Sequence, residues 1–529
     1  MIIIRNLRQE TDETLSDLRK KTAKKLRLNP DLIKDFHLVK RSLDARRKND
    51  LHYVCSVAFG YKGGEEAIIA REKNAALYEK PVFNIPAVSM PLRPVVAGFG
   101  PAGMFAGLVL SRAGARPIVL ERGEAVETRM EKVAAFRAGG SLDPECNVQF
   151  GEGGAGTFSD GKLNTGTHDP RLSWVLEEFY AHGAPETVLY DSKPHIGTDV
   201  LVGIVRSIRE EIIKNGGEVR FSNKLTGLEQ SCGRLSALKI SSPGGEYTLP
   251  CENLILAVGH SARDTFEMLN ALGLPMEPKA FSMGVRIEHR QDMIDLAQYG
   301  CPREGKKLPP ADYSLNVKLP GGDSAYTFCM CPGGEVFAAA SEEGGVVTNG
   351  MSYSKRDGEN ANSALLVTLR PEDFPEKDVL GGMRWQREIE RAAFKLGGSD
   401  YRAPAQLSGD FIKGVPSTKA GGVTPTYRPG VTWCDLNELL PVKITDTLRA
   451  AIPELAKRLR GFDAPDAVLT APETRSSSPV RILREASCRC KGLSGLYPCG
   501  EGAGYAGGIS SAAVDGVRCA MAILEAQEQ

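Results

Sequence analysis

The sequence predicts an α/β protein of several domains, organised around a parallel sheet. Two stretches far apart, near residues 100 and 505, each combine a short apolar strand, a glycine-rich turn and an apolar helix. The length of 529 residues is the third observation, because single hydrophobic cores stop growing well below this size. We therefore expect two remote segments to complete one domain, with further domains before and between them.

The first stretch, residues 93–112, is uncharged between its end arginines. It predicts a strand at 95–97, a turn holding Gly98, Gly100 and Gly103, a helix to about residue 114, and a second strand ending at Glu121. Glycines at this spacing allow a sharp turn, contact between backbone and pyrophosphate, and close helix–strand packing. The helix N-terminus favours phosphate, and the acid is placed to bind a ribose. The pattern predicts dinucleotide binding; its glycines and prolines argue against a membrane helix.

The composition of the chain limits its expected binding partners and its expected location in the cell. Sixty-six basic residues balance 66 acidic ones, so no global field draws the chain to nucleic acid or membrane. The apolar run at residues 1–5 is too short for a signal peptide, and the 12 scattered cysteines do not form a disulfide framework. We expect a cytoplasmic protein that does not enter a membrane.

Residues 1–80 predict a small α+β domain: a strand at 2–4, a helix that begins within residues 11–15 and runs to about 27, and strands at 36–43 and 51–59. This segment holds 18 Lys/Arg and 12 Asp/Glu. The excess could mark an RNA or acidic partner, although solvated surfaces explain it more simply. Residues 81–93, rich in proline, predict a linker.

The central region predicts the rest of the first domain and a second one. A helix is expected at about 125–138 and another at 201–213, with strands from 218, a hairpin near 243, and a buried strand from 253 that ends in a glycine turn. Residues 150–166 contain six glycines, which suits a loop lying against a flat or anionic ligand better than a mobile surface loop. Residues 268–469 show short strands, turns and isolated helices such as 383–395, and predict an inserted α+β substrate or cap domain.

The second glycine-rich stretch, residues 495–523, distinguishes flavin from nicotinamide. It predicts a strand, an acid (Glu501) in a glycine turn, and a long apolar helix. A fold that binds only a nucleotide does not need a distant carboxylate beside a second helix N-terminus. FAD does, because its ribitol hydroxyls and flavin carbonyls need partners. We therefore expect a Rossmann-like, three-layer FAD-binding domain formed by residues 94–267 and 470–529.

The segment 94–122, the crossing at 256–259, Gly500-Glu501 and Gly507-Gly508 resemble FAD-dependent oxidoreductases with the glutathione-reductase-type FAD fold. The N-terminal module, the loop at 151–162 and the segment 327–335 look more narrowly like a family of mostly uncharacterised bacterial FAD-dependent dehydrogenases. Many relatives have Gly-Asp where this chain has Gly500-Glu501.

The resemblance implies roles for particular residues. The pyrophosphate would lie against Gly98, Gly100, Pro101, Ala102 and Gly103; Glu121 would hold the ribose, and Arg122 and the Leu225 backbone the adenine. Arg129 would either reach the pyrophosphate or lie exposed on its helix. The α-helix that begins at Gly508, Ile509 and Ser510 would face the flavin pyrimidine, beside Gly500 and Glu501. The remaining expected cofactor residues belong to the glycine-rich loop and the 256–259 crossing: Gly156, Thr157, Ser159, Asp160, Lys162, Ala257, Val258 and Gly259.

No catalytic side chain is obligatory, because flavin supplies the hydride chemistry. His195 and His260 are candidate proton donors or structural histidines, and Arg286 could bind an anionic substrate or pair with Glu288. The Cys329/Cys331 and Cys488/Cys490 pairs could be redox-active, but they lack metal-site spacing and inert buried thiols are commoner.

We therefore expect an FAD-dependent oxidoreductase that passes two electrons between FAD and a small organic substrate. Because no second glycine fingerprint appears, NAD(P)H would dock only transiently. The alternatives are a flavin-dependent RNA-modifying or RNA-binding protein that uses the basic N-terminal domain, and an FAD-binding scaffold without turnover.

Overall fold

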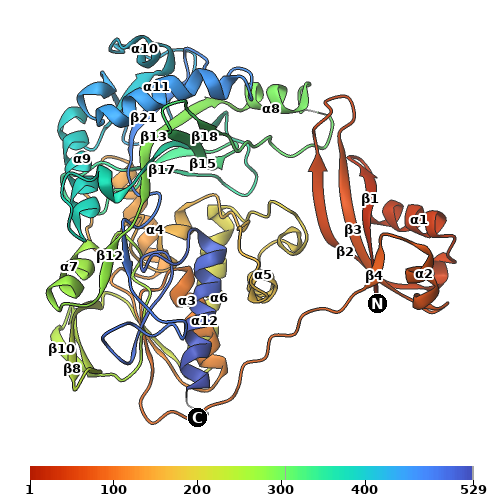
Figure 1. Cartoon of the computed structure of the whole chain (residues 1–529), viewed down its shortest axis with the longest axis horizontal. Helices are drawn as coiled ribbons and strands as arrows, with labels where there is room; N and C mark the ends of the chain where they lie inside the picture. The colour runs from red at the N-terminus through yellow and green to blue at the C-terminus, as the bar shows by residue number, and fades with distance from the viewer. Residues whose placement is uncertain (304, 527–529) are drawn as a thin grey trace.

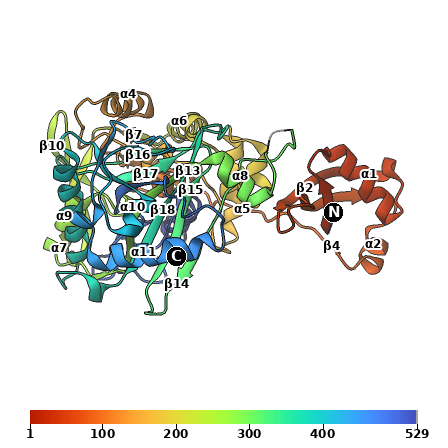
Figure 2. The same cartoon turned by 90° about the horizontal axis from the view of Figure 1, so that it is seen from above.

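The computed structural model describes residues 1–303 and 305–526. It has a small N-terminal domain set apart from a large body that contains two principal sheets (Figures 1 and 2). Residues 78–94 contain no helix or strand and run along the lower side of the body in Figure 1.

The N-terminal domain is a four-stranded antiparallel sheet in the order β2-β3-β1-β4, with two helices. Its elements are β1 (Ile2–Glu10), α1 (Leu15–Leu26), the 3₁₀ helix η1 (Pro30–Leu32), β2 (Ile33–Asp44), β3 (His52–Tyr61), α2 (Glu65–Arg71) and β4 (Ala75–Leu77). Thr14 caps α1 in a reciprocal pair with Asp17, which explains where this helix begins. The predicted strand–helix–strand–strand order is confirmed, and α2 and β4 complete the sheet beyond it.

This domain touches the body through the end of its β2–β3 hairpin. Arg41 forms a bidentate ion pair with Asp191 at 2.7 and 2.9 Å, and the Lys48 ammonium donates to the Ala297 carbonyl at 2.8 Å. Leu43 and Leu51 pack against the core of the body.

The first sheet of the body is parallel, as predicted, with strand order β23-β11-β5-β6-β7. It contains β5 (Val95–Ala97), β6 (Ile118–Leu120), β7 (Glu218–Arg220), β11 (Leu254–Leu256) and β23 (Leu496–Pro498). One core packs this sheet against α3 (Pro101–Arg112), α5 (Arg171–Ala181), α6 (Thr198–Lys214) and α12 (Ile509–Glu525). A second core lies between the sheet and the antiparallel strands β8 (Lys224–Ser231), β9 (Arg234–Ser242) and β10 (Gly245–Pro250).

Helices α3 and α12 bring the two remote glycine-rich segments together. A side chain at Gly516 of α12 would place its Cβ 2.1 Å from the Ala102 carbonyl oxygen of α3. The two helices can therefore approach this closely only because position 516 is glycine. Since both helices follow strands of the same sheet, their N-termini reach the same edge of it.

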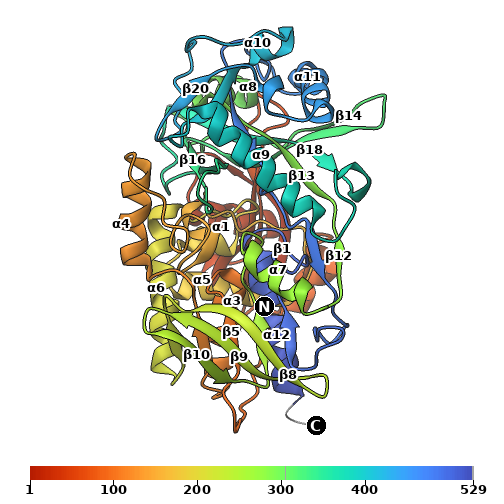
Figure 3. The same cartoon turned by 90° about the vertical axis from the view of Figure 1, so that its left-hand side faces the viewer.

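The second sheet of the body has seven strands in the order β14-β15-β18-β13-β21-β19-β20, antiparallel except for the β19–β20 pair. Its strands are β13 (Phe281–Arg290), β14 (Asn316–Lys318), β15 (Ser324–Cys331), β18 (Asn360–Leu369), β19 (Ala403–Leu407), β20 (Val431–Trp433) and β21 (Val468–Glu473). Figure 3 shows this sheet and its helices above the domain of the parallel sheet. The sequence predicted short strands here; β13 and β18 are longer, and both are buried along almost their whole length, which removes the alternation that marks a strand.

The remaining elements connect these layers. The helices are α4 (Val126–Arg137), α7 (Arg263–Ala271), α8 (Gln291–Tyr299), α9 (Gly381–Gly397), α10 (Ser408–Lys413) and α11 (Val442–Ala456). The 3₁₀ helices are η2 (Gly154–Phe158), η3 (Glu186–Leu189), η4 (Pro371–Asp373) and η5 (Leu436–Glu438). Strands β16 (Glu335–Ala338) and β17 (Thr348–Met351) form a hairpin, and β12 (Met276–Pro278) pairs with β22 (Val480–Ile482) where the chain leaves the parallel-sheet domain and returns. Among the described residues, no helix is long and apolar enough to span a membrane.

Candidate functional site

A cavity of about 470 Å³ lies between the carboxyl edge of the parallel sheet and the seven-stranded sheet. Both glycine-rich segments, the 254–262 crossing and the 149–165 loop line it. Residues 312–314, 327–330, 349, 473, 475 and 476 line it from the side of the seven-stranded sheet and its neighbouring loops. Among the cofactor residues expected from the sequence, Gly103, Arg129 and Thr157 do not line the cavity, and the others do.

The first glycine turn is shaped by two positions where a side chain cannot fit. Gly98 has φ +98°, and a Cβ there would lie 2.4 Å from the Ala257 carbonyl oxygen. A Cβ at Gly103 would lie 1.9 Å from the Gly98 carbonyl oxygen, so Gly103 acts behind the turn, in helix–strand packing. Gly100 differs, because a Cβ there would meet only the Gly154 Cα, at 3.7 Å. Gly100 therefore keeps space open in the cavity wall rather than inside the protein.

Glu121 joins three loops around this turn. Its carboxylate accepts backbone N–H groups from Phe99 (2.8 Å), Gly123 (2.9 Å) and Gly151 (2.9 Å), and the side chain is buried. Among the described residues, Oε2 accepts only the Phe99 N–H, so one of its lone pairs remains available to a ligand hydroxyl in the cavity.

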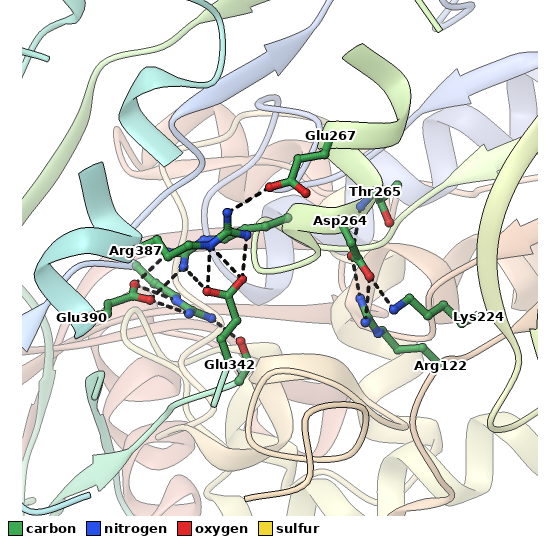
Figure 4. Close-up of polar contacts among 11 residues, drawn as sticks. Arg122, Lys224, Asp264, Thr265, Glu267, Glu342, Arg387 and Glu390 are labelled. Carbon is green, nitrogen blue, oxygen red and sulfur yellow. Dashed lines mark hydrogen bonds and ion pairs between the residues drawn. The ribbon is translucent and has the colours of Figure 1, made fainter. Parts of the chain in front are cut away.

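Arg122, expected against the adenine, lines the cavity but is held by acids. It forms a bidentate ion pair with Asp264 at 3.0 Å and a third bond to Glu145 at 2.6 Å, with its guanidinium 4.0 Å from the centre of the Phe150 ring. Figure 4 shows Asp264 directed toward Arg122 and Lys224, and Glu267 directed toward Arg387. Helix α7 therefore anchors the cofactor-side cluster and also contacts α9 of the second domain.

Arg129 does not lie where either prediction placed it. It is fully buried rather than exposed, and its guanidinium donates to the backbone carbonyls of Asn147, Val148, Gly151 and Glu152. Its donors are thereby used in fixing the 147–152 loop, away from the cavity. Thr157 is also buried behind the wall, where its carbonyl accepts from the Thr198 hydroxyl at 2.6 Å.

The glycine-rich loop ends in a buried charge cluster. Asp160 pairs with Arg356 and with the Lys162 ammonium, the latter at 2.8 Å. Burial would raise the pKa of the Asp160 carboxyl, but Lys162 and Arg356 outweigh burial and lower that pKa. Burial likewise opposes the charge of Lys162, and Asp160 raises its pKa above the usual value. Two cations share one carboxylate, so this part of the wall carries a net positive charge.

The second glycine turn presents Glu501 and His260. Glu501 accepts the Gly508 N–H at 3.0 Å, and its other oxygen lies 3.3 Å from His260 Nδ1. Burial would raise the pKa of Glu501, yet the bond from His260 and the Gly508 amide hold it below the usual value. His260 Nε2 is buried and has no hydrogen-bond partner among the described residues, although His260 lines the cavity.

Asp515 supports this turn and was not predicted from the sequence. It accepts the Gly500 N–H at 2.8 Å and forms a bidentate ion pair with Arg484 at 2.6 and 2.9 Å. The available signal was an aspartate in the middle of a largely apolar helix.

Two other predicted side chains have different places. His195 does not line the cavity; its Nε2 faces the Ser354 carbonyl at 3.2 Å, and burial lowers its pKa. Arg286 pairs with Glu473, at 2.7 and 2.8 Å, so of its two alternatives the pairing with Glu288 is wrong. Its remaining bonds go to Asn362, Asn349 and the Cys329 carbonyl, so Arg286 is saturated behind the cavity wall.

The donor set fits a flavin dinucleotide. The α3 N-terminus has no side-chain cap, and Gly100 leaves a cradle there that a Cβ would partly fill. The α12 N-terminus, which begins at Gly508 and has no side-chain cap among the described residues, lies beside the anionic Glu501 and the His260 ring. A phosphate group and a hydroxyl-bearing chain would satisfy these groups together.

Two sequence families match separate parts of the chain. The family described as "FAD-dependent protein, C-terminal domain-like" matches residues 280–476, which contain the entire seven-stranded sheet. A domain of unknown function (DUF8436) matches residues 1–60. Together with the site geometry, the first match identifies an FAD-dependent protein, and FAD is its cofactor.

A protein of Clostridium beijerinckii described as "Uncharacterized protein" is 48% identical over 532 residues, which cover 99% of this chain and 98% of that protein. The chain belongs to the same family as this protein.

The solved structures that the chain matches are less similar to it in sequence. The anhydrotetracycline hydroxylase OxyS of Streptomyces rimosus is 16% identical, with a TM-score of 0.23, over 53% of this chain and 47% of that one. A geranylgeranyl bacteriochlorophyll reductase-like protein of Thermoplasma acidophilum is 11% identical, with a TM-score of 0.36, over 82% and 79%. The chain thus matches less than half the length of the first, and scores this low bear on neither fold nor chemistry.

Proposed function

We propose that this protein is an FAD-dependent oxidoreductase that passes two electrons between FAD and a small organic substrate. The observation that carries the proposal is the continuity of the cavity. The same space is lined by both glycine turns and by Tyr313, Thr327, Cys329 and Asn349 from the second domain. A substrate bound on that side would therefore share the cavity with the cofactor, with no wall between them.

The chain's own groups divide the binding of FAD among them in this proposal. The N–H groups at the start of α3 bind the pyrophosphate, and the free lone pair of Glu121 accepts a ribose hydroxyl. Glu501 and His260 bind the ribitol, and the α12 N-terminus faces the flavin pyrimidine. FAD, when bound, supplies the two-electron chemistry. We also propose that the FAD-binding domain is of the glutathione-reductase type and that the protein acts as a dehydrogenase.

On the substrate side, Lys162 and Arg356 exceed Asp160 by one positive charge, which favours an anionic group beside them, either on a ligand or in the cavity wall. His260 lines the cavity and Glu501 orients its ring through Nδ1, so His260 is our candidate for exchanging a proton with a bound molecule. NAD(P)H would act as a transient second ligand.

Anaerobic spectroscopy of the full-length protein tests the proposal. We expect the visible flavin bands to bleach on addition of NADH or NADPH and to return with a small-molecule oxidant. A flavin that dithionite bleaches but no physiological reductant or substrate does would instead indicate an FAD-binding scaffold. For the RNA alternative, Arg8, Arg41 and Arg46 of the basic N-terminal domain pair with carboxylates, so these three side chains do not add to a free basic surface.

A further inference from the structure

Two cysteines meet at the end of β15, in the wall of the cavity. Cys329 lines the cavity and is half-buried, while Cys331 is buried behind it. The pairing of β15 with β18 slips between Phe328 and Cys331, and Cys329 has φ +44°, in the left-handed region that non-glycine residues rarely occupy. This bulge places the Cys331 sulfur 3.3 Å from the Cys329 carbonyl oxygen.

The surroundings favour one ionised and one protonated sulfur. The Lys162 ammonium donates to the Met330 carbonyl between the two cysteines, and Arg286 donates to the Cys329 carbonyl at 2.9 Å. Asp160 and Glu473 are the opposing acids nearby. The hydrogen bond from Cys331, followed by Lys162 and Arg286, outweighs burial and lowers the pKa of Cys329 to about 5.

The same hydrogen bond raises the pKa of Cys331 well above its ordinary value, and burial adds to this effect. The pair thus presents a thiolate on the cavity side and a thiol beside it. A thiolate flanked by cations is the reactive form of cysteine, and an adjacent second thiol is what a disulfide requires.

The other pair with the same spacing provides a contrast. Cys488 and Cys490 are both buried and do not line the cavity. The Cys488 thiol interacts with Cys519 rather than Cys490 and its pKa is raised, and burial raises the pKa of Cys490 to about 11. The spacing alone therefore does not create a reactive pair; cavity access and the adjacent cations do.

We propose that Cys329 and Cys331 form a redox couple, a second two-electron centre in the substrate half of the FAD cavity. Closing the couple forms the Cys329–Cys331 bond, breaks the S–H bond of Cys331, and releases one proton and two electrons. The electron pair passes to oxidised FAD, and reduced FAD reopens the disulfide in the reverse direction. This inference rests on the proposed function for its electron acceptor.

Peptide mass mapping of the full-length FAD-bound protein tests the couple directly. Trypsin releases residues 319–355, a peptide in which Cys329 and Cys331 are the only cysteines. After air or diamide oxidation and denaturation in iodoacetamide, we expect this peptide to be two hydrogens lighter and unalkylated. After anaerobic photoreduction of the flavin, without any thiol reagent, we expect both cysteines to be alkylated.

Two results would overturn the proposal: a doubly alkylated peptide after diamide oxidation, or a disulfide that photoreduced flavin leaves closed. If the protein held no FAD, the proposed function would fail, while the diamide result would still decide whether the two sulfurs can couple.

Reductive titration gives a second, independent measurement. Oxidised wild-type protein should consume two electron equivalents more per FAD than Cys329→Ser or Cys331→Ser. The control Cys232→Ser, which removes an exposed cysteine, should titrate like wild type. Equal electron uptake by all four proteins would contradict the couple. Because the mapping needs no variant, a serine variant that failed to fold would not prevent the test.

Discussion

Replacing Gly100 by alanine should weaken FAD binding without disturbing the fold. The added Cβ would meet only the Gly154 Cα, at 3.7 Å, which is ordinary contact. Gly100 has φ −78°, a conformation open to alanine. Its loss as a helix N-cap costs a few tenths to about 1 kcal/mol, which the lower entropy of the unfolded chain offsets by about 0.4–1 kcal/mol. The free energy of unfolding without FAD should therefore stay nearly unchanged.

In the FAD-bound protein, the added methyl group of Gly100→Ala would contact the cofactor. If the pyrophosphate lies against the Gly100 backbone, the methyl overpacks that contact by about 1–3 kcal/mol. At 1.4 kcal/mol per tenfold, Kd for FAD should rise by about 5- to 150-fold. Titration of the FAD-depleted protein with FAD, followed by flavin fluorescence, measures this change.

Gly103→Ala is the matched control. Its Cβ would lie 1.9 Å from the Gly98 carbonyl oxygen, so α3 must move and the protein should lose about 1–3 kcal/mol of stability with or without FAD. If Gly100→Ala bound FAD as tightly as wild type, or melted like Gly103→Ala in the absence of FAD, the assignment of the cradle would be refuted.

Three further predictions concern buried ionisable side chains. Glu390→Gln should lower the free energy of unfolding by about 3–5 kcal/mol, because Arg263 and Arg475 would lose their shared buried carboxylate. Burial lowers the pKa of His289 to about 4 from 6.5. Since the unfolded chain takes up this proton first, stability should fall by about 3 kcal/mol as pH drops from 6.5 to 4. Glu121→Gln should cost about 1–3 kcal/mol, because its amide replaces an oxygen that accepts backbone N–H groups.

Denaturant unfolding with and without FAD checks all three. Glu454→Gln, which breaks an exposed pair with Lys457, should change stability by less than about 1 kcal/mol and serves as the control for Glu390. His289→Gln should flatten the pH dependence between 4 and 6.5; an unchanged slope would contradict the assignment to His289. An unaltered Glu121→Gln protein would show that its carboxylate does not hold the three loops.

The glycine turns were predictable because their constraint is local. The conformation of Gly98 and the close packing of Gly103 follow from a pattern within ten residues, and the secondary structure of this region was predicted almost element by element. The ion-pair partners of Arg286 and Arg356 were not predictable in the same way. Arg286 meets Glu473 across 187 residues, and Arg356 meets Asp160 across 196, so no local pattern identifies either partner.

Arg129 shows a second reason for failure. Its position on the helix was predicted, but its donors go to backbone carbonyls of a loop, and side-chain chemistry in the sequence gives no signal for such acceptors. For Cys329 the spacing was visible, whereas the bulge that places Cys329 in the cavity wall with Cys331 behind it depends on the register between β15 and β18.

The most direct test of the account is the flavin content of the purified full-length protein. If the turns at residues 98–103 and 500–508 form one site, the protein should carry a single FAD per chain, visible as flavin absorbance and released on denaturation. A colourless protein that takes up no added FAD would contradict the account at its foundation.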